Sequence, residues 1–311
     1  MLNPHLKSFA LSPPILEAKK LGAPIVALES AVITHGLPIP TNLELAREVE
    51  SIVRDNGANP ATIALLDGKI HIGLSDSQLE RLATLETSRK ISLRDFGIAL
   101  AGGLSGGTTV AATLFAASNA GIRVFATGGI GGVHRGAPFD VSADLVQLGR
   151  SPVVVVCAGA KAILDLAATR EVLETHGVPV IGYQTDEFPA FYTRKSGFPV
   201  DLRVETPAEA ANIAVQAWQA GLKSAVLLVV PPPAEEAMSP EVMEGAIEDA
   251  LGEAEAQGIA GAATTPFLLA RVSQLTGGES LQANLALLHQ NASVAAQVAV
   301  AMHDRYGVGP I

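Results

Sequence analysis

Residues 124–161 read VFATGGIGGVHRGAPFDVSADLVQLGRSPVVVVCAGAK, and this stretch indicates the class of fold. It holds two short apolar runs, Val124–Ala126 and Val153–Cys157, separated by a glycine-rich segment and a short helical pattern. Strands that are apolar on both faces are typical of a sheet that helices cover on both sides. The stretch therefore predicts a strand, a helix and a second strand of one α/β sheet.

Similar apolar runs recur along the chain, with helical patterns between them. The further predicted strands are Ile25–Leu28, Thr62–Leu66, Ile98–Leu100, Val178–Gly182 and Ala225–Val230. This alternation predicts a three-layer α/β/α fold with a central, mostly parallel or mixed sheet. Residues 1–311 are expected to form one domain, because apolar sequence continues beyond Pro231–Pro233, which we interpret as a stiff connector.

Several predicted helices carry start or stop signals. Thr41 with Glu44 predicts a capping box, and Gly57 suits the end of that helix. Ser239 before Pro240 predicts an N-cap followed by proline in the first turn. A last helix is expected from about residue 279 to residue 306.

Composition excludes several classes of function. The chain has 21 Lys and Arg against 31 Asp and Glu, a net charge of −10, which argues against binding to nucleic acid or to an anionic membrane. Its one cysteine, Cys157, excludes an internal disulfide framework. The uncharged stretch Phe96–Ile122 is broken by glycines too early for a membrane span. With no signal-peptide pattern at the N-terminus, we expect a cytoplasmic protein.

Two charged residues follow predicted strands directly. Glu29 comes after Ile25–Leu28, where burial would raise its pKa and suit it to general acid catalysis; the alternative is a structural ion pair or loop cap. Lys161 follows eight uncharged residues, and burial there favours the neutral amine that forms imines with sugar aldehydes. The alternative for Lys161 is a surface lysine in the first turn of a helix.

The glycine-rich segment after Val124–Ala126 offers a second kind of chemistry. Its glycines at 128, 129, 131, 132 and 136 and the helix that follows could hold a phosphate, or could form only a tight turn. Asp140, with Asp144 nearby, could bind Mg²⁺ or Mn²⁺ together with several waters. Alternatively, Asp140 or Ser142 only caps the helix.

Other polar residues are weaker candidates. Lys90 could donate to a phosphate oxygen or simply be solvated. Thr109 lies at a second turn-to-helix junction, where hydroxyls and amides are available to a polar ligand. Further possible contacts from elsewhere in the chain are His35, His134, Arg135, Asn284 and Asn291.

These segments together resemble the family of pseudouridine-5′-phosphate glycosidases, which also contains proteins called indigoidine synthase A-like. The resemblance runs in order from about residue 16 to residue 305. It rests on ALESAVITHGLPIP, ATIALLDGKIHIGLS, ISLRDF, GGTTVAAT, VFATGGIGGVHRGAPFDVSADL, VVVVCAGAKAILDL, GVPVIGYQTDEFPAF, TPFLLARVSQLTGG and SLQANLALLHQNA.

The resemblance implies an enzyme that reversibly converts pseudouridine 5′-phosphate and water into uracil and ribose 5-phosphate, with Mn²⁺ or another divalent cation, as a homotrimer. It implies Glu29 as proton donor, Lys161 as covalent nucleophile and Asp140 as metal ligand. The residues that match substrate-binding or other pocket positions are Lys90, Val110, Ser142, Ala143, Asp144, Thr127, His134 and Asn284.

Three alternatives share parts of this pattern. An imine-forming aldolase would use the same lysine on a bond within the sugar. A non-catalytic sensor would bind ribose 5-phosphate without forming an adduct. A family member with a different base specificity would keep the chemistry and change the leaving group.

Overall fold

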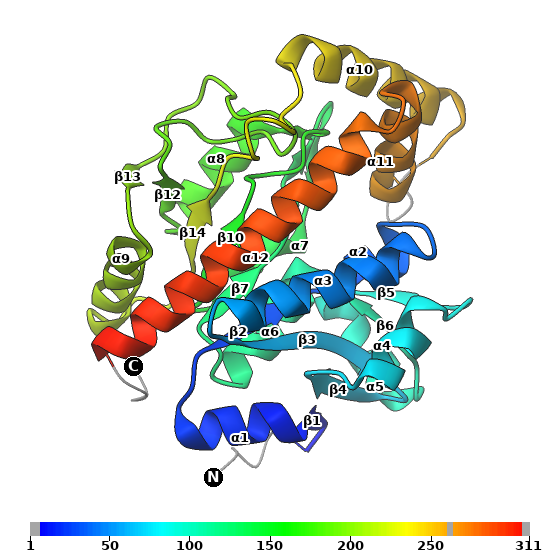
Figure 1. Cartoon of the computed structure of the whole chain (residues 1–311). Helices are drawn as coiled ribbons and strands as arrows, with labels where there is room; N and C mark the ends of the chain where they lie inside the picture. Colours follow the sequence, from blue (N-terminus) through cyan, green and yellow to red (C-terminus); the bar gives the residue numbers. More distant parts are fainter. Residues whose placement is uncertain (1–6, 260–263, 307–311) are drawn as a thin grey trace.

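The computed structural model describes residues 7–259 and 264–306, and its centre is one mixed sheet (Figure 1). The eleven strands of this sheet in the described ranges are β1 (Phe9–Leu11), β2 (Ile25–Leu28), β3 (Asn59–Leu66), β4 (Lys69–Ile72), β5 (Arg89–Ile91), β6 (Gly106–Thr108), β7 (Val124–Ala126), β10 (Val154–Cys157), β12 (Val180–Tyr183), β13 (Leu202–Val204) and β14 (Val226–Val229).

The strand order is β1-β4-β3-β2-β7-β10-β14-β12-β13, with β6 pairing β3 and β5 at one side. The central strands β2, β7, β10 and β14 are parallel, and only β4 and β6 run antiparallel to β3 among the described pairs. All four residues of β10 are buried, as both-faced apolar strands require. A second, small antiparallel sheet is formed by β8 (Val133–His134), β9 (Ala137–Val141) and β11 (Leu164–Asp165). In the chain, β8 and β9 come after β7, and β11 comes after β10.

Helices cover both faces of the large sheet. The long helix α12 (Glu279–Tyr306) crosses one face over β2, β7 and β10, between α3 (Thr41–Asp55) and α9 (Pro207–Gln219) (Figure 1). Helices α6 (Val110–Asn119) and α7 (Ala143–Leu148) pack together on the other face. The predicted three-layer α/β/α architecture is confirmed.

The remaining helices lie outside this central sandwich or at its ends. They are α1 (Pro13–Leu21), α2 (Ala31–His35), α4 (Asp76–Ala83), α5 (Phe96–Ala101), α8 (Leu166–Thr175), α10 (Pro240–Ala256), α11 (Thr264–Leu275) and the short 3₁₀ helix η2 (Leu93–Asp95).

Most predicted elements agree with the structure, but the strand predicted at Ile98–Leu100 is wrong. These residues belong to α5, in which Phe96 and Ala99 are buried and Ile98 is 56% exposed. That spacing of three is helical, and an apolar run this short does not distinguish a helix from a strand.

The start signals had mixed outcomes. Ser239 caps α10, since its Oγ accepts from the Val242 N–H at 3.2 Å, as predicted. Thr41 does not cap α3: it is the first helical residue, and Pro40 supplies the capping carbonyl, which accepts from the Glu44 N–H at 3.2 Å. That bond is the ordinary first hydrogen bond of the helix, and a proline at the cap position adds no side-chain hydrogen bond to it.

Helix α12 spans the predicted residues and is the one helix in the described ranges that is long and apolar enough for a membrane span. Its apolar residues Leu287, Ala295 and Val298 are fully buried against the rest of the chain. The helix therefore has the character of a core helix of the sandwich.

Candidate active site

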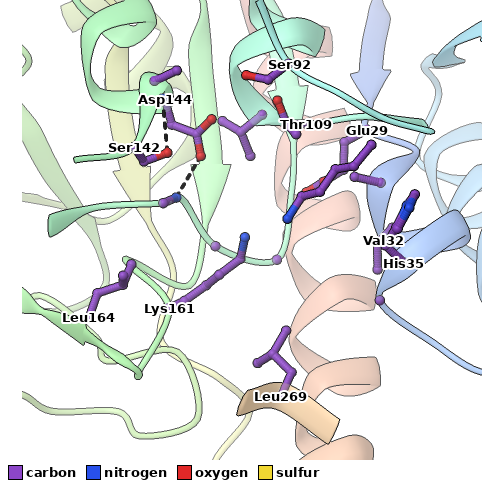
Figure 2. A pocket seen from close by; sticks show the side chains of 18 of the residues that line it. Glu29, Val32, His35, Ser92, Thr109, Ser142, Asp144, Lys161, Leu164 and Leu269 are labelled. Carbon is purple, nitrogen blue, oxygen red and sulfur yellow. Dashed lines mark hydrogen bonds between the residues drawn. The ribbon is translucent and has the colours of Figure 1, made fainter. Parts of the chain in front are cut away.

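A pocket of about 510 Å³ lies at the carboxyl ends of the central strands. Glu29 follows β2, Gly128 and Gly129 follow β7, and Lys161 follows β10, and all four residues line it. Because parallel strands end at the same edge of a sheet, residues far apart in sequence meet there. Figure 2 shows Glu29 and Lys161 entering this one pocket.

The Glu29 carboxyl group lies next to Thr127, the residue that follows β7. Thr127 Oγ1 donates a hydrogen bond to Glu29 Oε1. Burial is the largest influence on the pKa of Glu29 and raises it; Lys161, the Thr127 hydroxyl and Lys90 pull that pKa down, and Asp144 raises it. The net direction is upward, which confirms the direction expected for a carboxyl group at this strand end. A carboxyl group that keeps its proton longer is suited to act as an acid.

Lys161 lies in the loop between β10 and β11, and α8 begins five residues later, at Leu166. Its placement in the first turn of a helix, one of the alternatives, is therefore wrong. The Lys161 backbone N–H donates to the Ile130 carbonyl at 3.1 Å, which fixes where its side chain starts. In the part of the chain that the structure describes, no carboxylate forms an ion pair with its amine.

A second cationic group lines the pocket near Lys161. Lys90 of β5 is half-buried, and burial and the nearby Lys161 charge lower its pKa. His35, on the same wall, has a lowered pKa because it is partly buried and close to Lys90. Arg94 also lines the pocket. A cavity with several basic groups attracts an anion such as a phosphate.

Asp144 accepts hydrogen bonds from two backbone amides, a role that its position in the sequence did not indicate. It is 5% exposed, its Oδ1 accepts from the Ala111 N–H and its Oδ2 from the Gly131 N–H, both at 2.8 Å. Ser142 caps α7 by accepting from the Asp144 N–H at 3.2 Å. Asp144 thus ties the start of α6 to the glycine-rich segment, and the Gly131 amide, one of those expected to face a phosphate, is already occupied.

The structure brings most of the candidate residues together. Those that line the pocket are Glu29, His35, Lys90, Thr109, Val110, His134, Ser142, Ala143, Asp144, Lys161 and Asn284. Thr127 does not line it: at 1% exposure it lies behind Glu29, beside a second, much smaller cavity. Arg135 is occupied elsewhere, because it binds Glu244 and the carbonyls of Ala162 and Leu164.

Several pocket residues had no signal in the sequence. Leu269 and Leu288 come from α11 and α12 and give the pocket an apolar wall, and Phe191 extends that wall. Phe191 has φ of 62°, an uncommon conformation for a non-glycine residue, and a side chain at Gly129 would collide with its ring. Only the packing of distant segments brings these residues to the site.

Asp140 lies on β9 close to the pocket but is exposed and does not line it. Within the described ranges, no three His, Cys, Asp or Glu side chains come together as a metal cluster, and no hydrogen bond or ion pair occupies the Asp140 carboxylate. This arrangement fits a hydrated cation held by one carboxylate and waters.

The role of Asp144 in holding the site predicts a stability effect. Replacing it by alanine leaves the buried Ala111 N–H without an acceptor, at a cost of about 1–3 kcal/mol, and also frees the half-buried Gly131 N–H. We expect Asp144→Ala to lower the free energy of unfolding in urea by several kcal/mol. Asp144→Asn keeps one acceptor oxygen, so its free energy of unfolding should fall by less. Equal stability of Asp144→Ala and the unchanged chain would contradict this role.

Comparison with known proteins agrees with the motifs. The family model "Indigoidine synthase A like protein" matches residues 14–301. The chain is 56% identical to a pseudouridine-5′-phosphate glycosidase of Herpetosiphon aurantiacus, over 94% of this chain and 97% of that protein. It is 53% identical to one of Caldanaerobacter subterraneus subsp. tengcongensis, over 95% and 97%.

Solved structures with similar folds agree as well. The prealnumycin C-glycosynthase AlnA, in complex with ribulose 5-phosphate, matches with a TM-score of 0.89 and 41% identity, over 96% of this chain and 98% of that one. An indigoidine synthase A-like protein of Thermotoga maritima matches with a TM-score of 0.85 and 39% identity, over 90% and 93%. The chain belongs to the family of indigoidine synthase A-like proteins.

Proposed function

We propose that this chain reversibly cleaves the C–C glycosidic bond of pseudouridine 5′-phosphate, giving uracil and ribose 5-phosphate. The observation that carries the proposal is the meeting in one pocket of Glu29 and Lys161, which follow β2 and β10, with Lys90 of β5. Relatives that are 53–56% identical over nearly the whole chain bear the name of this activity. The complex of AlnA with ribulose 5-phosphate further supports a five-carbon sugar phosphate as ligand.

The bond to be broken explains why a lysine is needed. Uracil would leave as a carbanion at C5, so the pair of carboxylates that hydrolyses ordinary glycosides has no exocyclic oxygen to protonate. An amine bound at C1′ changes this, because the nitrogen lone pair can form a C=N bond as the C1′–C5 bond breaks. A carboxylate or a hydroxyl group at the position of Lys161 has no nitrogen lone pair and could not form this C=N bond.

The proposed sequence assigns one task to each group. Glu29 gives its proton to the ring oxygen O4′ while the Lys161 amine adds at C1′, which opens the sugar ring. The Lys161 nitrogen loses a proton after adding, and the electrons of the C1′–C5 bond take up that proton at C5, so uracil leaves and an imine, as its cation, remains on Lys161. Water hydrolyses the imine, which frees ribose 5-phosphate and the amine.

The basic side of the pocket would bind the phosphate. Lys90 supplies a charge there, with Arg94 and His35 on the same side of the pocket. Binding energy from the phosphate, remote from the reacting bond, would place C1′ next to Lys161. Asn284 and the apolar wall at Leu288 then remain for the base.

We also propose that Asp140 holds Mn²⁺ or another divalent cation, with waters as its other ligands. Such a cation can polarise the carbonyl groups of uracil and so stabilise charge on the leaving base. The exposed, unengaged carboxylate supports this assignment.

The cation assignment predicts weaker metal binding when the carboxylate is lost. We expect Asp140→Asn to bind Mn²⁺ more weakly than the unchanged chain, measured as the electron paramagnetic resonance signal of free Mn²⁺ during titration. Asp165→Asn on β11 is a matched control, since Asp165 caps α8, and should titrate like the unchanged chain. Equal Mn²⁺ binding by the chain with and without Asp140 would exclude Asp140 as the ligand.

A homotrimer in the cytoplasm is the expected setting. Phe139, which is 99% exposed on β9, is the apolar side chain that we expect to lie in the contact between copies. Light scattering should give three times the chain mass of 32.0 kDa, and Phe139→Ser should lower that mass. A mass of one chain at micromolar concentration would rule out the trimer.

The reaction itself is tested by synthesis in reverse. Uracil, ribose 5-phosphate and Mn²⁺ are mixed with the protein, and pseudouridine 5′-phosphate is sought by chromatography with mass detection. We expect product with the unchanged chain and none with Lys161→Ala. If no product forms but borohydride traps ribose 5-phosphate on Lys161, the base is not uracil; with neither product nor adduct, the enzymatic proposal fails.

A further inference from the structure

The buried side chain of Asn291, in the middle of α12, contacts the segment that follows β7. Its Nδ2 donates to the Thr127 carbonyl at 2.8 Å and lies 3.4 Å from the Gly128 carbonyl. Both partners are acceptors, so the nitrogen and not the oxygen of the amide must face them. Asn291 is 1% exposed, and no pocket-lining role accounts for it.

The segment that Asn291 contacts, residues 127–130, connects both proposed catalytic groups. On one side the Thr127 hydroxyl donates to Glu29 Oε1. On the other side the segment pairs with the chain beyond β10: the Gly128 carbonyl accepts from Ala158 N at 2.9 Å, and the Ile130 carbonyl accepts from Lys161 N at 3.1 Å. A displacement of this segment would therefore move Glu29 and Lys161 together.

Close packing leaves the segment few other attachments to α12. A side chain at Gly128 would lie within 3.4 Å of Leu287 and Leu288, so the helix packs directly on backbone there. The Asn291 amide is the polar contact that α12 makes with this segment in the part of the chain described by the structure.

The buried amide of Asn291 carries a cost in folding free energy at this position. Its Oδ1 is buried and has no hydrogen-bond partner among the described residues. An amide group taken out of water without all its partners costs free energy, and an apolar side chain of similar size would avoid that cost. A leucine at this position would remove the unpaired oxygen, but it would also take from the Thr127 carbonyl the donor that Asn291 supplies.

We propose that Asn291 is a positioning residue: by holding the carbonyls of Thr127 and Gly128, it sets the positions of Glu29 and Lys161 for the cleavage step. The proposal rests on the function proposed above for the same pocket. It assigns to α12 a task in catalysis that involves no contact with substrate.

The test compares two asparagines with the same kind of bonds. Asn42 is also buried, at 2% exposure, and its Nδ2 bridges two backbone carbonyls, those of Ile33 at 2.9 Å and Ala83 at 3.0 Å. Asn42→Leu and Asn291→Leu both remove an amide that donates to two backbone carbonyls, and Asn42→Leu also removes the bond from Leu43 N–H to Asn42 Oδ1 at 2.8 Å, so the control is the more disruptive of the two. Only Asn291→Leu releases residues 127–130. Asn291→Ser is prepared as well, in case the leucine variant does not fold.

We expect Asn291→Leu to lower kcat for pseudouridine 5′-phosphate by about 10²-fold, the effect typical of a misplaced reacting group, with little change in KM. The rate at which borohydride traps ribose 5-phosphate on Lys161 should fall as well. Asn42→Leu should lose stability but keep its kcat within about twofold, the effect of a merely structural bond.

The pH profile of kcat distinguishes a displacement of the groups around Glu29 from a general loss of stability. The groups that face Glu29 are Thr127, Lys161, Lys90 and Asp144, and the Thr127 hydroxyl lowers the pKa of Glu29. If that donor moves away, the pKa of Glu29 rises, Glu29 stays protonated to higher pH, and the alkaline limb of kcat moves upward. Asn291→Leu and Thr127→Val should both show this shift, and Asn42→Leu should not.

Unchanged kcat and pH limb in both Asn291 variants would overturn the proposal. So would equal losses of kcat in Asn42→Leu and Asn291→Leu. If the unchanged chain proves inactive, hydrogen exchange still decides the positioning claim. Amides of residues 127–130 and of Lys161 should then exchange faster in the Asn291 variants than in Asn42→Leu, and equal exchange would overturn it.

Discussion

The active site depends on backbone pairing that continues beyond the ends of β7 and β10. Ile130 N donates to the Gly159 carbonyl at 3.0 Å, and Lys161 N donates back to the Ile130 carbonyl at 3.1 Å. A Cβ at Gly159, which has φ of 85°, would collide with the Pro189 carbonyl. Glycine there permits the close approach that carries Lys161 to the strand end beside Glu29.

The sequence indicated that the glycine-rich segment could bind a phosphate. In the structure its glycines allow neighbouring segments to pack closely. A Cβ at Gly131 would collide with Ser142 and Asp144, and one at Gly132 with Thr169. The glycines let neighbouring segments approach, and Asp144 accepts the Gly131 amide. The basic residues that line the pocket, Lys90 foremost, are the partners that we propose for a phosphate.

The groups around Glu29 shift its pKa in opposite directions. Burial raises the pKa of that carboxyl group, and Lys161, the Thr127 hydroxyl and Lys90 oppose this effect. Opposed influences of this kind are characteristic of catalytic groups, whose protonation must change during the reaction. The same arrangement keeps a second cation, Lys90, with a lowered pKa, close to Lys161.

The sequence by itself determined the layers of the fold, most of the strands and the two residues, Glu29 and Lys161, that follow central strands, because apolar periodicity and strand ends are local patterns. The tertiary structure alone decided that Ile98–Leu100 is helical, that Asp144 holds backbone amides, and that Asn291 contacts residues 127–130. These outcomes depend on contacts between segments far apart in the chain, and such contacts leave no periodic or local signal in the residues that make them.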